Sequence, residues 1–177
     1  MITVMRLLLV PPVIWLILQH RYDLALWLFL FAGVSDGVDG FLAKQFGWTS
    51  RLGGLLDPVA DKLLLVSCYL ALSWEGLLAP WVVILVVARD VIILAGALVY
   101  HFRIARLEAS PTLSSKFNTL AQIMLVLLLL WGSGVAPVDP WWVVFMTWLV
   151  VLTTLLSGLE YVLIWGRKAW RGKNDAG

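Results

Sequence analysis

The sequence predicts an all-α integral membrane protein with six transmembrane helices and both termini in the cytoplasm. Three observations lead to this prediction: an apolar composition, six separate apolar segments, and basic residues concentrated in alternate connections. Of 177 residues, 62% are hydrophobic and 14% are charged, against roughly 45–50% and about 25% in soluble domains, and the mean hydropathy is +0.93. This composition excludes a soluble monomer and a disordered chain. The net charge of +2 argues against a nucleic-acid partner.

The apolar segments define the expected helices, which together form a single membrane domain over residues 1–177. A span takes about 20 apolar residues, and the second, third, fourth and sixth segments qualify. The first and fifth are short and need tilt, bilayer thinning or flanking residues to complete them. Pro11 and Pro12 should bend the first helix or move its start to Pro12. The expected helices are 5–18, 24–43, 55–73, 77–100, 117–131 and 141–165.

The distribution of lysine and arginine indicates the orientation in the membrane. With the N-terminus inside, the outer loops carry Arg21 alone. The inner segments carry Arg6, Lys44, Arg51, Arg103, Arg106, Lys116, Arg167, Lys168, Arg171 and Lys173. By the positive-inside rule, both termini face the cytoplasm. We therefore expect a multi-pass protein of the inner (cytoplasmic) membrane, in contact with membrane lipids.

Four aspartates lie inside predicted spans, Asp36 and Asp39 in the second and Asp57 and Asp61 in the third. A charge at such a position costs roughly 2.5–3.5 kcal/mol even on the lenient insertion scale, which marks it as a functional candidate. The spacings i,i+3 and i,i+4 place each pair on one helical face. Both pairs lie at a similar depth below the cytoplasmic surface, and so we expect four carboxylates to face one pocket.

Carboxylates so close together repel one another, so either some are protonated or cations neutralise them. Oxygen ligands select Mg²⁺, Mn²⁺ or Ca²⁺, and four carboxylates can hold two divalent ions about 3.5–4 Å apart, as in phosphoryl transfer. The alternative is pairing with nearby basic residues, namely Lys44, Arg51, Lys62 or Arg89. Pairing alone does not explain four acids on two helix faces.

Small residues accompany the aspartates. Gly33 and Gly37 form a GxxxG pattern, continued by Gly40 and Ala43. For Gly33 we expect a helix–helix contact. The other three run beside the acids and could let a bulky ligand approach the backbone.

Residues 36–61 contain the spaced pattern Asp36-x2-Asp39-Gly40-x2-Ala43-Lys44-x8-Gly53-x3-Asp57-x3-Asp61. This pattern resembles the signature of the CDP-alcohol phosphotransferases, also called CDP-alcohol phosphatidyltransferases, which transfer a phosphatidyl or similar group from a CDP-linked donor to an alcohol. Seven of the eight fixed positions match. At the eighth, Lys44 stands where the family has arginine; lysine keeps the charge but lacks the planar fork that binds phosphate.

The resemblance implies roles for the matching positions. Two divalent ions, Mg²⁺ or Mn²⁺, would be bound by Asp36, Asp39, Asp57 and Asp61. Asp61 would also be the general base. The donor CDP group would be bordered by Gly40, Ala43, Lys44 and Gly53. The resemblance further implies an active site facing the cytoplasm and a homodimer.

Four stretches carry a narrower resemblance: Ala25–Ala43, Ala88–Val91, Pro111–Gln122 and Gly166–Lys168. Through them, most of residues 2–168 resemble the CMP-forming cardiolipin synthases, whose donor is CDP-diacylglycerol and whose acceptor is phosphatidylglycerol. Arg89 and Lys116, with Arg51, could hold the acceptor phosphate; Arg89 and Asp90 could equally form a structural ion pair. The related phosphatidylglycerophosphate synthases, which use glycerol 3-phosphate, typically have Arg-Glu here and a second arginine about two turns later. This chain has no charge over 91–99, which favours phosphatidylglycerol, with glycerol 3-phosphate as the alternative.

A cation-coupled membrane transporter is the alternative of a different class, because intramembrane aspartates also line ion paths. Such sites usually belong to inverted repeats, and the sequence shows no internal repeat. Metal-dependent release of CMP from CDP-diacylglycerol would distinguish the two classes.

Overall fold

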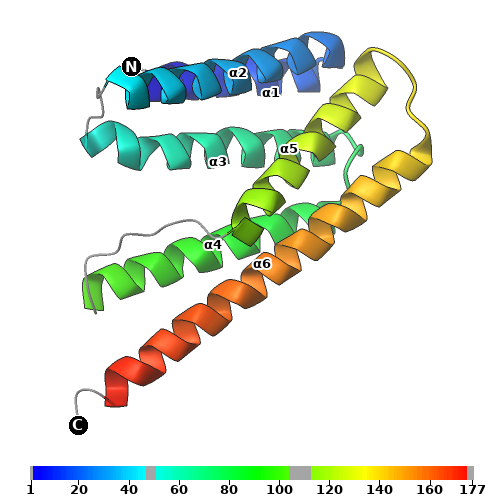
Figure 1. Ribbon diagram of the computed structural model, residues 1–177. Coiled ribbons are helices and arrows are strands. Elements are labelled where there is room, and N and C mark those ends of the chain that lie inside the picture. Colours follow the sequence, from blue (N-terminus) through cyan, green and yellow to red (C-terminus); the bar gives the residue numbers. More distant parts are fainter. Residues whose placement is uncertain (1, 47–50, 104–112, 175–177) are drawn as a thin grey trace. The chain divides into compact units, whose positions relative to one another are not determined.

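The computed structural model describes residues 2–46, 51–103 and 113–174, and within these ranges it contains six helices and no strand. Side chains are described over residues 7–35, 62–95 and 113–161. The helices are α1 (Ile2–Leu18), α2 (Tyr22–Phe46), α3 (Arg51–Trp74), α4 (Pro80–Arg103), α5 (Leu113–Gly134) and α6 (Pro140–Asn174) (Figure 1). The all-helical prediction is confirmed for this part of the chain.

The six helices begin one to four residues away from the predicted starts, and the differences at α1 and α4 have a visible cause. α1 begins at Ile2 and continues through Pro11 and Pro12, so these prolines do not mark its start. α4 begins at Pro80 instead of 77, because Gly76 takes a left-handed φ of +74° and the N–H of Leu77 donates to the carbonyl oxygen of Leu72 at 2.9 Å. This turn closes α3, and proline suits the first turn of the helix that follows.

Within the described residues, two helices are long and apolar enough to cross a membrane: α5, and α6 over Pro140–Tyr161. The short fifth segment is completed by flanking residues, as expected, because α5 includes polar residues ahead of position 117 at its start. The remaining described apolar stretches are shorter, namely Leu7–Leu18, Tyr22–Ser35 and Lys62–Trp74. Six spans and two cytoplasmic termini stay predictions.

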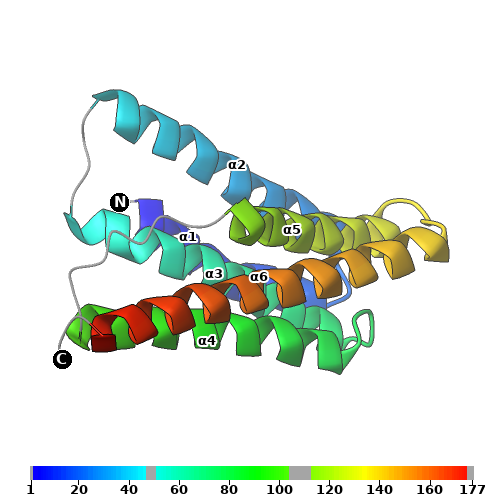
Figure 2. The same ribbon diagram turned by 60° about the horizontal axis from the view of Figure 1, so that its bottom comes forward.

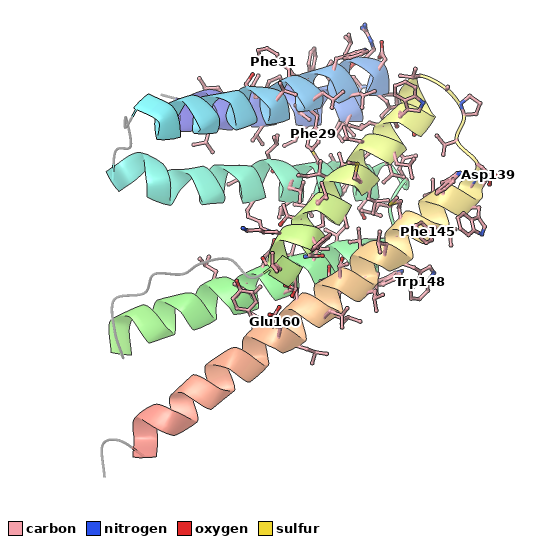
Figure 3. All side chains as sticks on the ribbon, in the orientation of Figure 1. Phe29, Phe31, Asp139, Phe145, Trp148 and Glu160 are labelled. Atoms are coloured by element: carbon pink, nitrogen blue, oxygen red, sulfur yellow. The ribbon has the colours of Figure 1, made fainter. Side chains whose placement is uncertain are left out.

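The exposed surface is strongly apolar. Trp15, Trp27, Ile84 and Trp148 are each more than 60% exposed, and Figure 3 marks Trp148 on α6 and Phe31 on α2 among such side chains. A soluble protein rarely shows so many large apolar side chains to water, whereas lipid accommodates them. Polar residues, by contrast, are among the most buried: Arg89, Asn118, Gln122, Thr154 and Ser157.

The chain divides into two compact units. The first unit comprises Met1–Pro80 and Val126–Val143, and the second comprises Trp81–Leu125 and Val144–Gly177. In the first unit α1 packs against both α2 and α3, and Figure 2 shows it beside α3. The face of α1 that carries Val10, Val13 and Ile17 is buried, as their helical spacing predicts.

The second unit contains α4, the first half of α5, and α6. Val82 and Val86 of α4 and Val150 of α6 are buried in it. The ring centroids of Trp81 and Trp148 lie 6.1 Å apart, which places α4 and α6 in contact.

Polar contacts join the connections at one end of the first unit. The Glu75 carboxylate is 11% exposed and lies 3.0 Å from His20 Nδ1. The hydroxyl of Tyr22 lies 3.5 Å from the same carboxylate oxygen. Burial, together with the negative charge of Glu75, raises the pKa of Tyr22, which precedes the predicted span.

Two glycines differ sharply in their surroundings. A Cβ at Gly134, the last residue of α5, would overlap the backbone nitrogen of Asp23 and lie 2.7 Å from the backbone carbon of Tyr22. A Cβ at Gly33 would meet nothing within 4 Å. The expected helix contact at Gly33 is therefore not formed in the described part of the chain, whereas Gly134 makes a close backbone contact.

We predict that Gly134→Ala destabilises the protein by about 1–3 kcal/mol, because backbone atoms cannot yield as a side chain can. Thermal unfolding of the purified protein in detergent measures the effect. Gly33→Ala is the control and should be neutral or slightly stabilising, since alanine favours the helix. An equal loss of stability in both variants would contradict the packing described for Gly134.

Candidate active site

The aspartates of the motif lie on two helices of the first unit, Asp36 and Asp39 on α2 and Asp57 and Asp61 on α3. Both helices are continuous across these positions, so each pair occupies one helical face. α1 packs against both helices. The aspartate side chains lie outside the described residues, and their convergence on one pocket stays a prediction.

The predicted donor-binding positions lie on the same two helices. Gly40, Ala43 and Lys44 are on α2, and Gly53 is on α3. Since α3 begins at Arg51, Gly53 falls in its first turn, where backbone N–H groups have no partner within the helix and attract anions. The side chains at these positions also lie outside the described part.

The chemistry of the donor set suits hard divalent cations, because carboxylate oxygens are preferred by Mg²⁺ and Mn²⁺. Among the described side chains, no group of three or more His, Cys, Asp or Glu residues could hold a metal ion. The four aspartates are not among those side chains. They remain the candidate metal ligands of this chain.

The predicted acceptor residue Arg89 is buried in the second unit. Its side chain is 5% exposed, and Nη1 donates to Asp90 Oδ1 at 2.7 Å. Nη2 donates to Ser115 Oγ on α5 at 2.9 Å and also to Ser157 Oγ on α6. The ring centroid of Tyr161, also on α6, lies 6.0 Å from Arg89 Cζ. The guanidinium therefore joins α4, α5 and α6.

The other predicted acceptor residues are placed differently. Lys116 follows Ser115 in the first turn of α5, and its side chain is exposed. Arg51 is the first residue of α3, with its side chain outside the described part. The ion pair of Arg89 with Asp90, which the sequence offered as one interpretation, is present. Binding of an acceptor phosphate by Arg89 stays a prediction.

Sequence reasoning missed the uncharged polar residues that join α5 to α6. Ser114 donates to the Glu160 carboxylate (Figure 3 marks Glu160 on α6). One turn further along α5, Asn118 Oδ1 accepts hydrogen bonds from Thr153 and Thr154, each at 2.9 Å. The signal was the i,i+4 spacing of Ser114, Asn118 and Gln122, which places three polar side chains on one face of an apolar helix.

Comparison with known proteins adds independent support. Residues 1–156 match the family CDP-alcohol phosphatidyltransferase. The chain is 32% identical over 169 residues to the chloroplastic CDP-diacylglycerol–glycerol-3-phosphate 3-phosphatidyltransferase 1 of Oryza sativa subsp. japonica, covering 85% of this chain and 51% of the relative.

Two other relatives carry a different name. The human cardiolipin synthase (CMP-forming) is 31% identical over 142 residues, covering 71% of this chain and 47% of the relative. The probable cardiolipin synthase (CMP-forming) of Drosophila melanogaster is 33% identical over 181 residues, covering 92% and 56%. The chain spans about half the length of these curated relatives. With the motif of residues 36–61 on two continuous helices and the family match over 1–156, the chain belongs to the CDP-alcohol phosphatidyltransferase family.

Proposed function

We propose that this chain transfers a phosphatidyl group from CDP-diacylglycerol to a glycerol-type alcohol and releases CMP, as a step of phospholipid synthesis in a membrane. The observation that carries the proposal is the placement of the motif aspartates, at helical spacing, on two uninterrupted helices of a family member. Family membership also favours this transferase over the cation-coupled transporter.

The four aspartates, Asp36, Asp39, Asp57 and Asp61, are proposed to hold two divalent ions, Mg²⁺ or Mn²⁺. When bound, such ions neutralise the donor's pyrophosphate and polarise its P–O bond. Asp61 accepts the proton of the acceptor hydroxyl. The acceptor oxygen forms a bond to the phosphatidyl phosphorus, the bond from that phosphorus to the oxygen of CMP breaks, and CMP leaves.

The donor's cytidine and pyrophosphate are proposed to lie along α2 and the start of α3. Gly40 and Ala43 have side chains small enough for a nucleotide to approach the backbone, and Lys44 supplies a positive charge. The free N–H groups of the first turn of α3, around Gly53, favour the negative pyrophosphate.

For the acceptor we propose phosphatidylglycerol, which would give cardiolipin. Asp90 lies 2.7 Å from Arg89 and balances much of its charge, and no further charged residue occurs over 91–99. A phosphodiester with one negative charge needs less cationic compensation than the dianion of glycerol 3-phosphate. Lys116 and Arg51 are proposed as the additional cations that bind the acceptor phosphate. The name of the rice relative favours glycerol 3-phosphate, which is the second candidate.

A membrane location follows from the same proposal, since both the donor and the proposed acceptor are lipids. The exposed apolar side chains of both units support it. Six spans, an active site on the cytoplasmic side of the inner membrane, and a homodimer complete the proposal.

The acceptor is tested by giving the purified protein CDP-diacylglycerol and Mn²⁺ with either phosphatidylglycerol or glycerol 3-phosphate. We expect cardiolipin and CMP from the first mixture and no phosphatidylglycerophosphate from the second. The opposite result would assign the chain to the phosphatidylglycerophosphate synthases, and CMP release from neither would refute the proposed activity.

The base is tested by Asp61→Asn, which removes the proton acceptor and a metal ligand while keeping the shape of the side chain. We expect turnover to fall by a factor of about 100 or more, with thermal unfolding unchanged. The matched control is Asp139→Asn, because Asp139 is exposed and its carboxylate accepts a hydrogen bond from the N–H of Trp141 at the start of α6. Retained activity in Asp61→Asn would remove this residue from the role of base.

A further inference from the structure

Some of the N–H donors in the Arg89 guanidinium have hydrogen-bond partners among the described residues, and one nitrogen has none. Nη2 carries two N–H groups, and two serines from different helices accept from it, Ser115 at 2.9 Å and Ser157. Nη1 donates to Asp90 at 2.7 Å. Nε, which is buried, has no hydrogen-bond partner among the described residues. A buried N–H without a partner costs about 1–3 kcal/mol, so this group is suited to donate a hydrogen bond to a ligand oxygen.

Other groups restrict the guanidinium further. Tyr161 lies one turn after Ser157 on α6, with its ring centroid 6.0 Å from Arg89 Cζ. Gly158 follows Ser157, and a Cβ there would lie 3.7 Å from Arg89 Cγ, so the stem of the arginine passes close to the backbone of α6. The head and the stem of Arg89 are therefore both fixed by α6.

The serines orient Arg89 without neutralising it. A serine hydroxyl accepts a hydrogen bond but carries no charge, unlike Asp90. Ser157 is fully buried, which places its contact with Nη2 away from solvent, where a hydrogen bond to a charged group is worth most. The arginine thus keeps a fixed direction together with a donor that none of the described protein groups uses.

We propose that Ser157 and Ser115 are positioning residues, which hold the guanidinium of Arg89 so that its Nε–H remains directed at one oxygen of the acceptor's phosphodiester. This inference rests on the proposed function, since it assigns the residues that place the acceptor. Removal of either hydroxyl lets the guanidinium rotate and weakens binding of the acceptor, while the donor site in the first unit is untouched.

The test is steady-state kinetics of cardiolipin formation with Ser157→Ala and Ser115→Ala. We expect the KM for phosphatidylglycerol to rise about tenfold, the loss expected for a hydrogen bond to a charged group. The kcat and the KM for CDP-diacylglycerol should stay unchanged. Ser157→Thr keeps the hydroxyl and should restore the acceptor KM. Thr154→Val is the matched control, because it removes a buried hydroxyl of α6 that contacts Asn118 instead of Arg89.

A double-mutant cycle shows whether Ser157 acts through Arg89. In an Arg89→Lys background, Ser157→Ala should cause no further rise in the acceptor KM, because lysine lacks the Nε–H that Ser157 would orient. Independent effects of the two substitutions would contradict the inference. So would a rise in both KM values, a fall in kcat, or a loss of thermal stability with no change in KM, since each would indicate a purely structural serine.

A binding measurement separates this inference from the proposed activity. Short-chain phosphatidylglycerol, added in detergent, should raise the Tm of the wild-type protein and of Ser157→Thr. It should raise the Tm of Ser157→Ala by a smaller amount. Diacylglycerol, which has no phosphate, serves as the blank. If the wild type is stabilised in this way but releases no CMP, the proposed function is wrong and the positioning role stands. If cardiolipin is formed but the stabilisation does not depend on Ser157, the positioning role is wrong.

Discussion

The ion pair between Arg89 and Asp90 is the interaction on which the second unit depends. Two charges that leave water lose several kcal/mol of solvation each, and their attraction repays this only when further hydrogen bonds satisfy them. Here two such bonds come from Ser115 and Ser157, so Nη2 of Arg89 on α4 finds its partners only when α5 and α6 are both in place. One buried cation therefore specifies how three helices meet.

Further hydrogen bonds determine how α5 and α6 pack against each other. In lipid, apolar side chains gain little by contacting each other in place of lipid tails, and so helices associate through packing and polar contacts. Ser114 with Glu160, and Asn118 with the two threonines, connect α5 and α6 at successive turns. A shift of one helix by a single residue would break both contacts at once, which fixes the register.

Local pattern was sufficient to predict six helices, because long apolar runs separated by Gly, Pro and charged residues leave few other choices. It failed at the start of α5, where Ser114, Ser115 and Lys116 look like a polar connection although Ser114 and Ser115 bond to side chains of other helices. It also failed at Gly33, where a Cβ would meet no atom of the described residues within 4 Å. The metal-binding role of the aspartates stays a prediction from their spacing. The serines around Arg89 were not predicted, since no local pattern states which helices will meet.

The close contact at Gly134 has a consequence for the evolution of the family. Selection at this position acts on the size of the residue, because backbone from the start of α2 occupies the volume that any side chain would need. If Arg89 places the acceptor, as proposed, divergence toward a new alcohol would alter the surroundings of Arg89 and leave this glycine in place. A glycine at the end of the fifth helix would then indicate that two proteins share this architecture. Other residues would indicate which substrate each of them uses.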